Sequence, residues 1–239
     1  MGEVYVRDGG SWQQIPNGTA LSVRDGGSWV NPTEVFVRSG GAWETVWLES
    51  DPLTVTSNVA GAETFRRSAG GTMSWNPAGD AGYAYIGRFS GSYDNVGCFN
   101  VTNGLYALAM GARQTVTSAS FTLKRGPSAG SSSISGTVYL GLYTGTFNSG
   151  TPLYTNLDFT PSGSKVLSSV GFDDVITFDL GTTFGQVVND AIRADGAVVL
   201  AYSVRTSGWD ATGSTDSLYS KWRGPSTAYT GTLSITCDY

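Results

Sequence analysis

A nine-residue motif occurs three times within the first fifty residues, and it limits the structures that this segment can form. Its pattern is V-x-V-R-[DS]-G-G-[SA]-W with small variations, and it ends at Trp12, Trp29 and Trp43. The Gly-Gly pair can adopt the positive φ angles that a tight hairpin turn requires. Apolar and polar residues alternate before the turn, which is typical of a half-buried strand. Each copy is therefore predicted to form a short β-hairpin.

The three hairpins are too small to bury their own apolar side chains. An isolated hairpin is only marginally stable in water, yet residues 1–50 hold four of the seven tryptophans of the chain. Partner chains or another protein must cover this apolar surface, unless the hairpins form a small meander that packs on the rest of the chain. The motif positions that we expect to mediate attachment or oligomerisation are Trp12, Trp29, Trp43, Arg7, Arg24 and Arg38.

Residues 51–239 are predicted to form a second domain that begins near Asp51-Pro52. Short apolar runs alternate there with turns rich in Gly, Ser and Thr, a pattern typical of all-β domains. One stretch, residues 182–192, has helical spacing and a candidate cap in Thr182 or Thr183. We therefore expect a jelly-roll-like β-sandwich with one short helix. The expected strands cover residues 81–89, 115–125, 135–144, 175–180, 197–205 and 230–237, and the expected loops cover 126–133, 148–152 and 161–164.

The chain contains no histidine, which excludes several kinds of chemistry. Ser-His-Asp and Cys-His catalysis and histidine-containing zinc sites all require it. Asp173-Asp174 could bind Ca²⁺ through oxygen ligands, but a solvated turn fits the surrounding sequence better. The enzymatic alternative is a glycoside hydrolase that uses two aspartates, yet no two aspartates lie in a recognisable catalytic context. We predict no catalytic residue, no metal ligand and no cofactor, and therefore no enzyme.

Charge and hydropathy exclude two classes of partner. The formal net charge of −5 argues against nucleic acid, because phosphate binding requires a positive field. No stretch of about eighteen apolar residues occurs, so we expect no insertion into a membrane. The first residues also lack the features of a cleaved signal peptide. Cys98 and Cys237 could form one disulfide bond or remain two separate buried thiols.

Three tryptophans after residue 51 lie in loop-like surroundings and are candidates for ligand binding. These are Trp75, Trp209 and Trp222, each flanked by Gly, Pro or polar residues. Exposed aromatic rings beside polar groups bind sugars by stacking on their apolar faces. The alternative is that each ring covers one end of a hydrophobic core.

The repeats in residues 3–47 resemble the short glycine-tryptophan hairpin repeats near the N-terminus of tail and other virion proteins of bacteriophages. The resemblance implies a structural virion protein that is commonly a homotrimer, with the repeats as its attachment segment. Other virion proteins would then be its partners. Such a protein is made in the host cytoplasm and is located in the virion.

The second domain resembles extracellular β-sandwich domains that accompany carbohydrate-binding and wall-associated proteins. Residues 118–123, 176–180 and 231–239 carry this resemblance. It implies a module for binding or spacing rather than a catalyst. Together the two resemblances imply a minor tail or fibre protein whose β-sandwich projects toward a glycan on the host surface. A carbohydrate-binding module outside any virion and a capsid decoration fibre are the alternatives.

Overall fold

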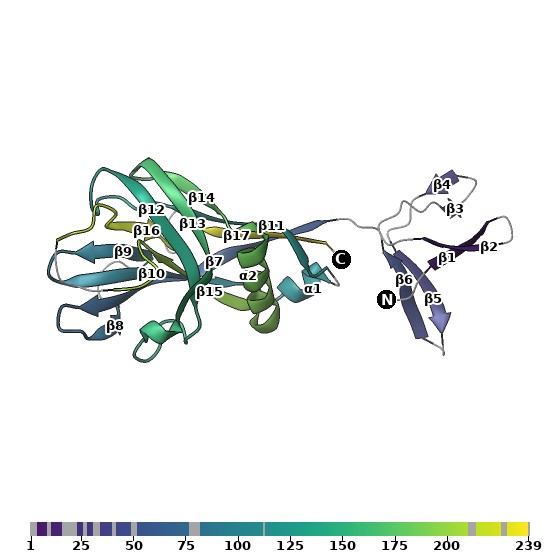
Figure 1. Cartoon of the computed structure of the whole chain (residues 1–239), viewed down its shortest axis with the longest axis horizontal. Helices are drawn as coiled ribbons and strands as arrows, with labels where there is room; N and C mark the ends of the chain where they lie inside the picture. The colour runs from purple at the N-terminus through teal and green to yellow at the C-terminus, as the bar shows by residue number, and fades with distance from the viewer. Residues whose placement is uncertain are drawn as a thin grey trace. The chain divides into compact units, whose positions relative to one another are not determined.

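The structure is a computed structural model that divides the chain into two compact units (Figure 1). The first, here called the hairpin unit, comprises Met1–Leu53 and the last two residues, and the second, here called the β domain, comprises Thr54–Cys237. The structure describes residues 52–76, 82–111, 113–209, 214–225 and 229–238. Within residues 1–50 it describes the backbone of six short strands.

The six strands of the hairpin unit form the three hairpins that the motif predicts. They are β1 (Val4–Asp8) with β2 (Ser11–Ile15), β3 (Val23–Asp25) with β4 (Ser28–Val30), and β5 (Glu34–Ser39) with β6 (Ala42–Leu48). Among the described residues, each hairpin is a two-stranded antiparallel sheet of its own. The motif arginine is the register partner of the motif tryptophan in all three, as Arg7↔Trp12, Arg24↔Trp29 and Arg38↔Trp43.

The β domain consists of one extended sheet. Its strands are β7 (Leu53–Ser68), β8 (Met73–Trp75), β9 (Tyr83–Phe89), β10 (Tyr93–Thr102), β11 (Thr115–Lys124), β12 (Ser133–Tyr143), β13 (Leu157–Gly171), β14 (Val175–Asp179), β15 (Ala197–Ser203), β16 (Ser220–Arg223) and β17 (Thr232–Asp238). The main path runs β13-β12-β15-β10-β7-β17-β11-β14, with β8 beside β7 and β9 between β10 and β16. The end strands β13 and β14 lie close together, so the sheet nearly closes around its core. The prediction of an all-β chain with one short helix is confirmed.

The predicted helix is present as α2 (Gly181–Asp195), but it begins differently from the prediction. Thr182 and Thr183 lie inside the helix, and neither caps it. Strand β14 leads directly into α2, and the carboxylate of Asp179 accepts a hydrogen bond from the Gly181 N–H at 2.9 Å. Two shorter helical segments, α1 (Tyr106–Met110) and the 3-10 turn η1 (Tyr154–Asn156), were not predicted.

The central strands β10 and β15 are buried on both faces. Phe99 on β10 and Leu200 on β15 belong to the main core inside the sheet. Their neighbours Cys98 and Ala201 belong to a second core on the opposite face. The second core also contains buried rings from β7, β8, β12 and β13, namely Phe65, Trp75, Tyr143 and Phe159. The sheet therefore has a hydrophobic layer on each side of its middle strands.

One predicted loop proves to be a strand. Residues 161–164 lie within β13, where Gly163 pairs with Leu140 and Ser164 pairs with Tyr139 of β12. Pro161 is compatible with this position because β13 is an end strand of the sheet path, where a missing backbone N–H breaks no ladder on the outer side. A Pro-Ser-Gly-Ser sequence is therefore not sufficient to end a strand at an edge.

Candidate functional site

A groove of about 350 Å³ opens on the β domain where β7, β9 and β10 come together. Its lining residues are Arg66, Asn76, Tyr85, Phe89, Tyr93, Asn95 and Tyr219. Four of the seven are aromatic, two are amides and one is a cation. We call this the aromatic groove. Strand β9, which carries Tyr85 and Phe89, lies at the end of the β domain that also carries β8 and β16, whereas α1 lies at the other end (Figure 1).

The aromatic side chains of the groove form a continuous surface. The rings of Tyr85 and Tyr219 are stacked, with centroids 5.9 Å apart and planes inclined by 15°. The ring centroid of Phe89 lies 5.1 Å from that of Tyr219, and Phe89 is 46% exposed to solvent. Tyr85 and Phe89 share one face of β9, while Ala84 and Ile86 on the other face are buried in the main core. The buried face holds β9 in place, and the aromatic face lines the groove.

The backbone position of Tyr219 depends on a loop from another part of the chain. Gly130 packs against Tyr219 so closely that a Cβ at residue 130 would lie 1.8 Å from the Tyr219 carbonyl oxygen. The φ angle of Gly130 is also positive, at 73°. Both observations require glycine there.

That loop is held by Arg125, whose side chain is fully buried. Its guanidinium donates to the Val170 carbonyl at 2.6 Å and to three carbonyls between residues 129 and 132. Burial lowers the pKa of this guanidinium below its ordinary value. Because the carbonyl oxygens replace water around the cation, Arg125 fixes the loop that in turn positions Tyr219.

The polar residues of the groove are held by hydrogen bonds. Asn95 donates from Nδ2 to the Gly87 carbonyl at 2.8 Å, and Gly87 has a φ angle of 80° that favours glycine. Arg66 donates from Nη1 to Asn76 Oδ1 at 2.8 Å and from Nε to Ser74 Oγ at 3.3 Å. The groove therefore combines an aromatic surface with fixed amide and guanidinium groups.

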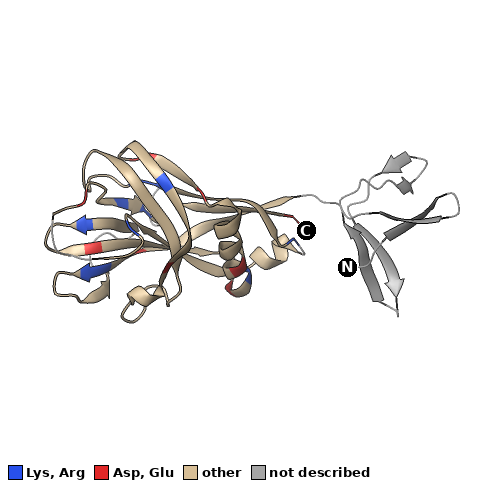
Figure 2. Ribbon diagram, in the orientation of Figure 1, with Lys and Arg blue, Asp and Glu red and all other residues tan. Residues whose placement is uncertain are grey.

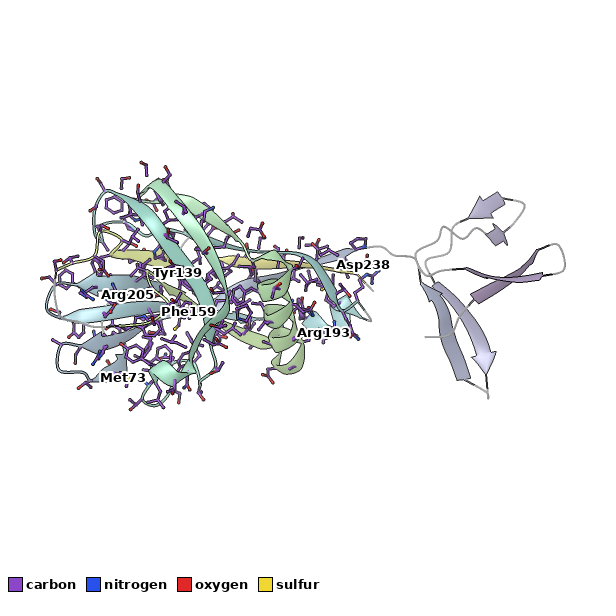
Figure 3. The ribbon with its side chains drawn as sticks, in the orientation of Figure 1. Met73, Tyr139, Phe159, Arg193, Arg205 and Asp238 are labelled. Atoms are coloured by element: carbon purple, nitrogen blue, oxygen red, sulfur yellow. The ribbon has the colours of Figure 1, made fainter. Side chains whose placement is uncertain are left out.

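An ion cluster lies beside the groove. Arg205 donates from Nη1 to Asp94 at 2.5 Å and from Nη2 to Asp216. Asp94 is almost completely buried, and Asp216 also accepts the backbone N–H of Arg88 at 2.6 Å. Figure 3 shows Arg205 at the same end of the domain as Met73 of β8, and far from Arg193. The cluster thus pairs two carboxylates with one guanidinium next to the groove.

The three tryptophans proposed as ligand contacts do not line the aromatic groove. Trp222 is fully buried in the main core, packs edge-on against Tyr202 at 5.1 Å, and donates to Ser220 Oγ at 3.0 Å. Trp75 belongs to the second core, and Trp209 packs against it. Trp75 is buried, whereas Trp209 is half-buried and stacks on Tyr154 with centroids 5.0 Å apart. The structure brings Trp75 and Trp209 together and keeps Trp222 apart from them.

For the motif tryptophans and arginines of the hairpin unit, the structure gives the strand register of the backbone. Their side chains lie outside the described part of the structure, so Trp12, Trp29 and Trp43 and their arginine partners remain predictions. The shared register shows that the three hairpins place them equivalently along the backbone.

Sequence reasoning missed the aromatic residues of the groove, although a signal was present. Tyr83, Tyr85 and Phe89 occur at odd positions of one strand, whereas the intervening Ala84 and Ile86 are small or aliphatic. Period-two alternation places the aromatic residues on the face away from the core. Tyr219 has no comparable local signal, because a distant loop positions it.

A second cavity of about 320 Å³ lies between α2, β12 and β15. Aliphatic side chains such as Leu142 and Val199 line it, with Asp195 as its one charged lining residue among those described. It has a single ring, that of Tyr143, and no guanidinium or amide side chain. Its lining therefore offers fewer specific contacts than the aromatic groove.

The two cysteines and Asp173 are part of the packing and the ion pairs of the β domain. Cys98 and Cys237 are separate buried thiols, and burial raises the pKa of both. Asp173 pairs with Arg223 at 2.5 Å and with Lys124 at 3.7 Å, and the Arg223 hydrogen bond lowers the pKa of its carboxyl. Within the described ranges, no group of three His, Cys, Asp or Glu residues could hold a metal ion. No helix of that part is long and apolar enough to cross a bilayer.

Neither a comparison with protein-family models nor one with curated proteins finds a match to this chain. The function must therefore be argued from the two units and the groove.

Proposed function

We propose that this chain is a structural protein of a bacteriophage virion, a minor tail or fibre protein that acts as a binding protein without catalysis. The hairpin unit attaches it to other virion proteins, and the β domain binds a glycan of the host surface through the aromatic groove. The proposal combines the resemblance of the repeats with the chemistry and position of the groove.

The position of the groove is the observation that carries this proposal. Strand β7 begins at Leu53, directly before the β domain, and Arg66 of the groove lies thirteen residues farther along the same strand. At roughly 3.3 Å per residue, this separation is about 40 Å. The groove therefore lies far along β7 from the residue that joins the β domain to the attachment segment, which suits a binding protein that is anchored through that segment.

The chemistry of the groove supports carbohydrate as the ligand. Sugars present apolar ring faces that stack on aromatic side chains, and hydroxyl groups that pair with amides and guanidinium groups. Tyr85, Phe89 and Tyr219 supply the aromatic surface, and Asn76 and Asn95 supply fixed amides. A volume of about 350 Å³ lies within the range of small-ligand sites.

The hairpin unit supports attachment and a trimeric state. Its strands have only three to seven residues and pair in separate two-stranded sheets, which are marginal on their own. Association with identical copies or with other virion proteins would cover their apolar residues. A closed cyclic trimer would also leave no open strand edges for aggregation.

Deleting residues 1–50 provides the first test. The truncated protein is expected to stay folded and soluble but to be lost from purified particles, as measured by quantitative immunoblotting. Full-length protein with Tyr219→Ala is the matched control, which should be incorporated normally and lose only ligand binding. Normal incorporation of the truncated protein would show that the hairpin unit is not the anchor.

The groove by itself also fits the alternative of a carbohydrate-binding module outside any virion. That alternative predicts a monomer in solution, whereas the virion proposal predicts a trimer, so the solution mass of the full chain separates them. A capsid decoration fibre would also be a trimer. A label on the C-terminus, imaged on intact particles, distinguishes a head location from a tail location.

A further inference from the structure

We propose that the aromatic groove recognises an acidic sugar, and that Arg66 binds the carboxylate of a uronic acid or similar unit. This inference rests on the proposed carbohydrate-binding function and specifies the ligand class of the same groove. Arg66 is the one charged residue among those lining it.

The guanidinium of Arg66 is held on three sides. Nη1 donates to Asn76 and Nε donates to Ser74, while the Tyr93 ring lies under the guanidinium carbon at 4.3 Å. These contacts fix the plane of the group in the groove before any ligand binds. No described residue accepts a hydrogen bond from Nη2, so its two hydrogens remain available to a ligand in the groove.

Arg66 also forms no ion pair with any carboxylate in the described part of the chain. Asp94, which precedes the groove residue Asn95 on β10, and Asp216 are both bound to Arg205. Figure 2 shows basic positions on β7 and β9 and an acidic position on β10 at this end of the domain. A half-buried cation without an acidic partner is complementary to an anionic ligand.

The charge of the whole chain makes this local arrangement more informative. The formal net charge is −5, so the protein as a whole repels anions. Long-range attraction cannot then account for binding an acidic sugar, and a short-range contact to Arg66 must supply it. Of the five guanidinium hydrogens, Nε and Nη1 each use one on Ser74 and Asn76, so one on Nη1 and two on Nη2 remain for a ligand. Arg66 is the one cation that lines the groove, which suits the single charge of a carboxylate better than the nearly double charge of a phosphate.

The test measures binding of oligouronates to the full chain by isothermal titration calorimetry. The probes are oligomers of galacturonic, glucuronic and mannuronic acid, each beside its carboxyl-reduced neutral form, together with sugar phosphates. We expect at least one acidic oligomer to bind about tenfold or more tightly than its neutral form, the size of one charge-assisted hydrogen bond.

Two variants assign the effect to one side chain. Arg66→Gln should abolish the preference for the acidic form, so that the acidic and neutral oligomers bind the variant with affinities within about twofold of each other. Arg67→Gln is the matched control, because it removes the same charge from the adjacent residue, whose guanidinium donates to the Trp209 carbonyl at 2.6 Å. It should retain the preference. Thermal unfolding of both variants should match that of the wild type, which checks that they are folded.

The possible failures are distinguishable. Equal binding of acidic and neutral oligomers, or a preference that survives Arg66→Gln, would overturn acid recognition and leave carbohydrate binding intact. Tighter binding of sugar phosphates than of any uronate would overturn the assignment of a carboxylate. If no sugar of either kind binds the wild type, the proposed carbohydrate-binding function fails, and this inference fails with it.

Discussion

The hairpin unit and the β domain differ in how far along the chain their strands find partners. Among the described strands of the three hairpins, the most widely separated register partners are Glu34 and Leu48. In the β domain, β7 lies beside β17, and Thr54 Oγ1 is 2.8 Å from Thr236 Oγ1. The strand that opens the domain therefore pairs with the strand that closes it. The strand pairing of each hairpin can be set by its own turn. The sheet of the β domain, in contrast, is complete only when strands from both ends of the domain's sequence have come together.

The two units also differ in where their stability comes from. The β domain has a main core and a second core on opposite faces of β10 and β15. The hairpin unit consists of two-stranded sheets, and such sheets cannot enclose a core of that kind. Removing a core side chain of the β domain should therefore lower its folding stability. An equivalent substitution in the hairpin unit should change association.

The largest effect is expected for Trp222→Ala. Trp222 is fully buried and contacts Tyr202, so its removal leaves a large cavity in the main core. The free energy of unfolding of the β domain should fall by about 3–5 kcal/mol, as measured by denaturant titration of the full chain. Trp209→Ala, at a half-buried ring, is the control and should cost less. A loss below about 1 kcal/mol at Trp222 would mean that the main core does not stabilise the domain.

The opposite behaviour is expected for Trp12→Ala, Trp29→Ala and Trp43→Ala. Each should weaken trimerisation or particle attachment by on the order of 3 kcal/mol, because a ring buried at an interface is lost. The unfolding of the β domain should be unchanged. Analytical ultracentrifugation measures the first quantity and denaturant titration the second. If all three variants associate normally, these tryptophans are not interface residues and the contrast between the units is wrong.

The sequence could predict the hairpins because their specification is local. A Gly-Gly pair between alternating residues determines the turn, and the register follows from it. Strand β10 was missed for the opposite reason. Its residues Val96 to Val101 are all buried or nearly so, because both faces are covered, and the alternation that marks a half-buried strand is absent.

The candidate site was harder to predict than the fold. Trp75 and Trp222 lie beside Pro and Gly in the sequence, yet both rings are buried. A tryptophan near a turn can cover the end of a core as readily as it can contact a ligand. The groove, in contrast, depends on Tyr219, whose place is set by the loop around Gly130 and by Arg125. Such long-range positioning leaves no pattern in the local sequence.

The smallest effect is expected from a change of pH by one unit. It should alter the free energy of unfolding of the β domain and leave the hairpin unit unaffected. Burial raises the pKa of Cys98 and of the phenols of Tyr106 and Tyr202 above their ordinary values. As the pH rises past about 9–10, the unfolded chain releases these protons while the folded chain retains them, so stability falls. Each group contributes up to about 1.4 kcal/mol per pH unit. Between about pH 6 and 8 stability should stay flat, because the chain has no histidine.

Denaturant titrations from pH 6 to 11 measure this dependence, and Cys98→Ala should reduce the loss of stability per pH unit in the alkaline range. Tyr5→Phe removes the only tyrosine of residues 1–50 and should leave the slope unchanged. Constant stability up to pH 11 would contradict the burial of these groups, and a slope that depends on Tyr5 would mean that the two units unfold together.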